Sequence, residues 1–169
     1  MQEYTSAATS INSNKVPKLF TVVDKHIGWF QGQVNIDIGG GKFDTATQYL
    51  WQRNVKNYIW DKYNRSYEHN LLVEKEIDNG EAHTVTLSNV LNVIKEKHVR
   101  MGLVLTAFRW VRPGGSIYIS VYNSKKEGES KSDCWQNAMT LKGYLKEIQQ
   151  EIYSEAFIKY GIIIINVPA

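Results

Sequence analysis

The sequence has little cysteine, no long apolar run and little excess charge, and each shortage excludes a class of protein. Cys134 is the single cysteine among 169 residues, so neither an internal disulfide framework nor a thiolate metal cluster can form. No apolar run approaches the length of a transmembrane helix. The first 14 residues are polar and lack the apolar core of a signal peptide. A reducing, cytoplasmic setting fits these absences.

The formal charge of +3 is too small to argue by itself for nucleic acid as a partner. Ten tyrosines and five tryptophans could form a stacking site for bases, or simply an aromatic core and rim. A hydrophobic fraction of 43% is ordinary for a soluble globular protein, and the length suffices for one domain. We expect a flexible N-terminal arm over residues 1–14 and a single domain over residues 15–169.

The chain is organised around segment 34–45, which reads Val-Asn-Ile-Asp-Ile-Gly-Gly-Gly-Lys-Phe-Asp-Thr. Alternating β-branched residues predict a short buried strand. The three glycines end that strand, because they allow positive φ and close approach to the backbone. Asp44 and Thr45 stand at the expected N-cap of a following helix. The result is either a cradle for a nucleotide-type ligand or a plain turn between strand and helix.

Asp37 and the glycines that follow resemble the first motif of class I S-adenosylmethionine (SAM)-dependent methyltransferases. The glycine pattern is not the fingerprint of NAD enzymes, because Phe43 and Asp44 occupy the later positions. It is not a phosphate-binding P-loop either, since no Gly-Lys-Ser/Thr follows at the required spacing. The resemblance implies a Rossmann-like α/β sheet with SAM lying over Gly39–Gly41.

A second acidic residue, Asp61, ends a predicted short strand over residues 57–61. In doubly wound folds an acid at this position accepts hydrogen bonds from ribose hydroxyls, although Asp61 could merely terminate the strand. The segment 61–66 resembles the Asp-Pro-Tyr-Asn-Arg-Ser form of phage and prophage methyltransferase-like proteins, with Lys62 in place of the proline. We expect Ser66 to cap the next helix.

The segment 83–94 predicts a strand followed by a turn into a helix. Its Ser-Asn-Val-Leu-Asn-Val-Ile part resembles the fourth-strand motif of the same group, and of methyltransferase-like proteins associated with DNA phosphorothioation. Only a few residues separate the preceding helix from this strand, so the third strand that is usual in the family should be missing or vestigial. The adenine-contacting acid therefore has no clear equivalent, and Asp78 and Glu81 are weak candidates.

The rest of the chain fits the same order of elements. Residues 16–29 predict an amphipathic helix, which in many class I methyltransferases lies over the SAM pocket. A helix over 96–111, a Pro-Gly-Gly break and a strand over 116–122 match the approach to the fifth strand. Residues 123–132 predict a charged, mobile loop, and residues 133–137 should lead into a last helix. Strand material follows at 157–158 and 161–165.

We therefore predict a Rossmann-like class I methyltransferase sheet flanked by helices, with a reduced strand set. The resemblance implies that the residues contacting SAM are Asp37, Gly39, Gly40, Gly41, Asp44, Asp61 and Asn89. Acceptor-side candidates, placed at strand ends and nearby loops, are Asn64, Arg65, Asn92, Tyr122, Trp135 and Gln136. No catalytic acid or base stands out, and no metal ligands are predicted.

The predicted function is methyl transfer to an unidentified acceptor, with nucleic acid as one candidate. Amino-methyltransferases of DNA carry an Asn/Asp-Pro-Pro-aromatic motif that segment 88–92 lacks, and cytosine-C5 chemistry needs a Pro-Cys nucleophile that Cys134 does not provide. An alternative is a catalytically silent SAM-binding or interaction module, for example one that counters host defence. A third is an enzyme that cleaves SAM without an acceptor. A phage-encoded protein would work in the host cytoplasm.

Overall fold

The protein, a computed structural model that describes residues 1–9, 15–77 and 80–169, contains one large sheet and one small one. The strands of the large sheet are β1 (Val34–Ile38), β2 (Lys56–Trp60), β3 (Ala82–Ser88), β4 (Val111–Ser120), β7 (Glu155–Lys159) and β8 (Ile162–Asn166). The small sheet is a hairpin of β5 (Gly128–Lys131) and β6 (Cys134–Gln136).

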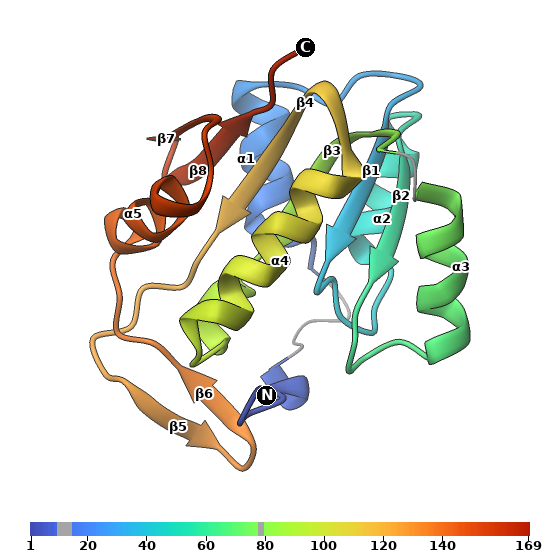
Figure 1. Ribbon diagram of the computed structural model, residues 1–169. Coiled ribbons are helices and arrows are strands. Elements are labelled where there is room, and N and C mark those ends of the chain that lie inside the picture. The colour runs from blue at the N-terminus through green and yellow to red at the C-terminus, as the bar shows by residue number, and fades with distance from the viewer. Residues whose placement is uncertain (10–14, 78–79) are drawn as a thin grey trace.

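The large sheet has the order β2-β1-β3-β4-β8-β7 (Figure 1). Strands β2, β1, β3 and β4 are parallel, whereas β8 is antiparallel to both of its neighbours. The chain passes from α3 to β3 with no further strand in the part that the structure describes, so β2 stays at the edge. The predicted α/β sheet with a reduced strand set is therefore confirmed.

Helices cover both faces of the sheet. They are α1 (Lys18–His26), α2 (Thr45–Trp51), α3 (Tyr67–Ile77), α4 (Lys97–Trp110) and α5 (Leu141–Glu151), with 3-10 turns η1 (Ala7–Thr9) and η2 (Leu91–Val93). Helices α1 and α2 share one hydrophobic cluster, while α3, α4 and α5 share another on the opposite face. The sheet is thus the middle of three layers, as binary patterning of helices and strands requires.

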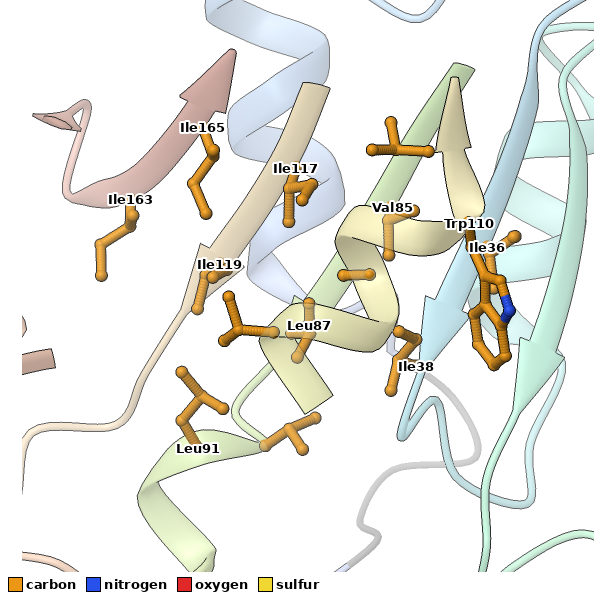
Figure 2. Packing of buried hydrophobic residues seen from close by; sticks show 14 of the residues in the cluster. Ile36, Ile38, Val85, Leu87, Leu91, Trp110, Ile117, Ile119, Ile163 and Ile165 are labelled. Atoms are coloured by element: carbon orange, nitrogen blue, oxygen red, sulfur yellow. The ribbon is translucent and has the colours of Figure 1, made fainter. Parts of the chain in front are cut away.

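Branched aliphatic side chains from four adjacent strands form the larger core (Figure 2). They alternate along each strand, so that pairs two residues apart face α4 and α5. The pairs are Ile36 and Ile38, Val85 and Leu87, Ile117 and Ile119, and Ile163 and Ile165. Burying each such side chain contributes roughly 1.5–3 kcal/mol, which fixes the register of the sheet.

Two ion pairs of different exposure tie helices together. Arg100 on α4 and Glu147 on α5 meet at 2.6 Å, and both side chains are largely buried. Arg53 and Asp24 meet at 2.8 Å beside α1, where both side chains are about one-third exposed. The first pair fastens the two helices on one face of the sheet, and the second fastens the end of α2 to α1.

Two predicted segments have a different structure. Residues 123–132, predicted as a loop, contain β5, and the segment expected to lead directly into a helix contains β6. These strands pair across a tight turn at Asp133, whose φ is +58°. The last helix therefore begins only at Leu141, and the Pro-Gly-Gly stretch belongs to the start of β4.

The predicted N-terminal arm lies in part against the body of the protein. The backbone N–H of Ser6 donates to the carbonyl of Asp133, and Ser6 is buried. Glu3 forms an ion pair with Lys95 in the segment between η2 and α4. Residues 10–14 of this arm lie outside the described residues, so its flexibility stays a prediction. The same holds for Asp78, a weak adenine-contact candidate; Glu81, the other one, is exposed just before β3.

Candidate functional site

The glycine bend directly follows β1 at the carboxyl edge of the sheet. Gly39 and Gly41 have positive φ values of 71° and 79°, which L side chains rarely adopt. A Cβ atom on Gly40 would lie 2.5 Å from Asp37 Oδ2, closer than real contacts allow. The packing of the bend therefore requires glycine at position 40.

Asp61 faces this bend from the end of the neighbouring strand. Its Oδ2 accepts a hydrogen bond of 2.8 Å from the backbone N–H of Gly41. Its Oδ1 accepts bonds of 3.0 Å from the N–H groups of Tyr63 and Asn64. Asn70 on α3 bonds both the N–H and the carbonyl of Asp61 and thereby holds the strand end in place. Asp61 therefore faces the glycine bend, and its role toward a ribose stays a prediction.

Arg65 clamps the outer part of the bend. Its guanidinium donates to the carbonyls of Gly41 and Phe43, at 2.8 and 3.1 Å, and to Asp44 Oδ1 at 2.8 Å. Asp44 occupies the N-cap position of α2, but its side chain does not cap the helix because Arg65 engages it. These bonds give Arg65 a role in shaping the bend, and its role toward an acceptor stays a prediction.

The Asp37 carboxyl lies beneath the bend and is buried. Thr86 on β3 donates to Asp37 Oδ1 at 2.9 Å. Burial raises the pKa of Asp37 to about 7, and the nearby charge of Asp61 adds to this, while the Thr86 bond and Arg65 oppose it. Asp37 therefore takes up or releases a proton near neutral pH inside the bend, which an exposed carboxylate would not do.

The segment after β3 completes the same edge of the sheet. Asn89 has a φ of +55° and bonds through its N–H to the carbonyl of Ser120. Next to it, the Val90 side chain lies 2.6 Å from where a Cβ of Gly39 would be, so this segment packs directly on the bend. Asn92 is buried, and its Oδ1 has no hydrogen-bond partner among the described residues.

Three predicted acceptor-side residues lie farther along this edge. Trp135 and Gln136 belong to β6, where the Trp135 indole N–H donates to Asn137 at 2.8 Å. Gln136 accepts a bond of 3.3 Å from Asn92, so these two residues are brought together. Tyr122 follows β4 and is 62% exposed, and no hydrogen bond or ring contact among the described residues links it to the bend.

The N-terminal segment contacts these loops, although its sequence predicts only a flexible arm with no role in the site. The Ser6 hydroxyl donates to the carbonyl of Val93 at 2.9 Å and accepts from the N–H of Trp135 at 3.1 Å. The Tyr4 ring lies 5.1 Å from that of Trp135. At the other end of the segment, Gln2 accepts a bond from the hydroxyl of Tyr63, whose backbone N–H bonds Asp61. Contacts this far apart in sequence leave no local pattern by which to predict them.

The fit of a ribose-bearing cofactor to the bend depends on how many hydrogen bonds Asp61 can still accept. A carboxylate offers about four lone-pair sites. Asp61 accepts bonds from the N–H groups of Gly41, Tyr63 and Asn64, and both of its oxygens also accept from the Asn64 side-chain amide at 3.4 Å. A ribose hydroxyl would therefore have to displace an existing bond, and the long bonds from the Asn64 amide are the weakest. Among the described residues, no group of three or more His, Cys, Asp or Glu side chains could hold a metal ion.

Comparison with solved structures identifies proteins that share this fold. No family model matches the sequence, and no curated protein resembles it at a significant level. A candidate SAM-dependent methyltransferase from Methanococcus maripaludis matches with a TM-score of 0.57 and 12% identity, over 89% of this chain and 85% of that one. A SAM-dependent methyltransferase from Aquifex aeolicus gives 0.56 and 12%, over 94% and 93%.

A larger protein matches over part of its length. Phosphoethanolamine N-methyltransferase 1 of Haemonchus contortus, in complex with phosphoethanolamine and S-adenosylhomocysteine, gives a TM-score of 0.51 and 14% identity. The match covers 98% of this chain and 44% of that one. No helix among the described residues is long and apolar enough to cross a bilayer. The chain has the Rossmann-like fold of class I SAM-dependent methyltransferases.

Proposed function

We propose that the protein binds SAM at the glycine bend and transfers its methyl group to an acceptor. The observation that carries this proposal is the hydrogen bond between Asp61 and Gly41, which joins the two motifs at the carboxyl edge of the sheet. Ligands of open α/β sheets bind at this edge. The solved methyltransferases that share the fold add support, at 12–14% identity.

Different residues around the bend would contact different parts of the cofactor. Asp61 would bind a ribose hydroxyl in place of the long bonds from the Asn64 side-chain amide, while Gly39–Gly41, which carry no side chains, would let the cofactor lie close. The segment beside Asn89 would meet its amino-acid end. Bound SAM supplies a sulfonium methyl group that is ready for in-line transfer, so the protein needs chiefly to orient the acceptor and exclude water.

Isothermal titration calorimetry with SAM and S-adenosylhomocysteine tests the first half of the proposal. We expect saturable binding of both at one site per chain. Absence of binding to either compound, by protein that is folded by circular dichroism, would remove the proposal. Protein with Gly102→Ala serves as a matched control, because Gly102 lies on α4 and a Cβ there meets no atom within 4 Å.

A radiolabelled-methyl assay tests the second half of the proposal, which is methyl transfer to an acceptor. The resemblance to phage and prophage proteins puts DNA and RNA on the panel, and the H. contortus enzyme adds phosphoethanolamine as a small acceptor. Host lysate and a mixture of metabolites complete the set. Transfer to any of them supports an enzyme, whereas binding without transfer supports the silent module. Loss of SAM in buffer alone would instead indicate a SAM-cleaving enzyme.

A further inference from the structure

The edge strand β2 presents backbone groups that no other strand pairs. The N–H of Lys56 and the carbonyl of Trp60 bond toward β1. Because hydrogen bonding alternates along a strand, Asn57 and Ile59 direct their backbone groups away from the sheet. His69 binds the carbonyl of Ile59 at 2.7 Å. The N–H and carbonyl of Asn57 and the N–H of Ile59 have no partner among the described residues.

A hollow runs along this edge where another strand could lie. Its volume is about 410 Å³, and Asn57, Tyr58 and Ile59 form its floor. Thr47 and Gln48 of α2 line it on one side, and Asp44, Arg65 and His69 line the rest. Thr47 and Gln48 also line an adjoining hollow of about 390 Å³ that extends to Trp51. Open edges of this kind are sites at which a further strand adds to a sheet.

Exposed apolar side chains flank the edge on both faces of the sheet. Trp51, at the end of α2, is 72% exposed, and Leu72, on α3, is 63% exposed. Helix α3 runs back along β2, with His69 at the level of Ile59 and the charge of Glu76 acting on Lys56. Leu72 therefore lies between them, close to the level of Tyr58, the centre of the strand.

Charges on α3 are arranged to complement a copy of the same helix. Glu68 and Lys75 are both exposed and seven residues apart, so they lie on the same side of the helix, on either side of Leu72. A two-fold axis at Leu72 places Glu68 of each chain beside Lys75 of the second copy. The same axis places Asn57 opposite Ile59 of the second copy, so that the open N–H of Ile59 meets the carbonyl of Asn57. The N–H of Asn57 then meets an Ile59 carbonyl that already binds His69 and would have to accept a second bond.

We propose that β2 pairs antiparallel with β2 of a second copy of this chain, which forms a two-fold dimer with one continuous sheet. The contact is self-complementary, as a two-fold interface must be. It buries Trp51 and Leu72 and satisfies the open backbone groups.

Charge exchange on α3 tests this geometry directly. Glu68→Lys alone and Lys75→Glu alone should each weaken dimerisation at least tenfold in analytical ultracentrifugation, because each variant brings like charges together across the axis. The double variant should restore wild-type affinity. Both positions are exposed, so the fold is preserved. A wild-type protein that stays monomeric up to 1 mM, or single variants without effect, would overturn the proposal.

Two further measurements locate the contact. Trp51→Lys and Leu72→Lys should each produce a monomer, while the control Leu105→Lys should leave the dimer intact, since Leu105 is 48% exposed on α4. Amide hydrogen exchange should show the N–H groups of Asn57 and Ile59 protected in the dimer and fast in the Leu72→Lys monomer. A dimer in which these two amides exchange quickly would use another surface. Capture of a peptide by a monomeric protein would likewise contradict a second copy as the occupant.

Discussion

Asp61 and Gly41 lie on different segments of the chain, yet a 2.8 Å hydrogen bond joins the carboxylate of one to the backbone N–H of the other. The bond links the end of β2 to the turn after β1. It means that the acid expected to hold the cofactor also supports the bend on which the cofactor would lie. Substitutions at either position therefore affect both the shape of the site and its affinity.

Replacing Asp61 tests its role toward the cofactor. If Asp61 accepts a hydrogen bond from the ribose, Asp61→Ala should weaken SAM binding by roughly 1–3 kcal/mol. Calorimetry measures the affinity, and Glu155→Ala, an exposed carboxylate on β7, is the control. An unchanged affinity in the Asp61 variant would assign the carboxylate to the bend alone.

Gly40 and Gly102 make a matched pair for testing the bend. A methyl group on Gly40 would meet Asp37 Oδ2 at 2.5 Å and Ile59 Cγ2 at 2.9 Å, whereas one on Gly102 meets nothing within 4 Å. Gly40→Ala should lower the free energy of unfolding by about 1–3 kcal/mol through overpacking. Gly102→Ala, inside α4, should raise it by about 0.5–1 kcal/mol. Urea denaturation measures both, and equal effects would mean that the bend is not tightly packed.

Asp37 gives the stability a defined dependence on pH. Its pKa is raised by burial from 3.8 to about 7, so the folded state holds a proton that the unfolded state releases. The protonated carboxyl contributes at most about 4 kcal/mol to the free energy of unfolding. This contribution is fully present below about pH 4 and is lost as the pH rises to about 7. Asp37→Asn should remove this slope in urea denaturation at several pH values. Parallel stability curves for wild type and variant would contradict a buried neutral carboxyl.

Two arginines contrast a buried ion pair with an exposed one. Arg100→Met should lower the free energy of unfolding by roughly 3–5 kcal/mol, because it leaves the largely buried Glu147 carboxylate without its partner and removes a bond from the Lys95 carbonyl. Arg53→Met, which breaks a pair about one-third exposed, should cost about 1 kcal/mol or less. Thermal or urea unfolding compares the two. Similar costs would mean that solvent reaches the interface between α4 and α5.

Local patterns predicted much of this protein because the corresponding structures are local. The strand before the glycines, the helix after them and the cap at Ser66, whose hydroxyl accepts from the N–H of His69 at 3.1 Å, all depend on neighbouring residues. The position of Asp61 beside the glycine bend was predictable, because the end of the second strand lies next to the end of the first in such sheets. The reduced strand set was predictable from the short connection between α3 and β3.

Other features depend on contacts that sequence spacing does not reveal. The β5–β6 hairpin has few apolar residues, so its charged sequence resembled a loop. Arg65 was an open candidate for a phosphate or carboxylate, and the sequence could not show that its guanidinium binds the carbonyl of Gly41. Ser6 lies more than a hundred residues from Trp135, yet its hydroxyl accepts that residue's N–H. The cofactor and acceptor roles of all these residues stay predictions, as does the cytoplasmic setting.

The docking of residues 2–6 against η2, β6 and the loop after β2 bears on how the protein should be produced. A purification tag fused ahead of Met1 would extend from a segment that contacts Tyr63 and Trp135, beside the candidate site. Ala169, by contrast, lies past β8 near Gly114, at the amino end of the sheet. A histidine tag placed after Ala169 leaves ligand titrations free of interference from the vector-derived residues.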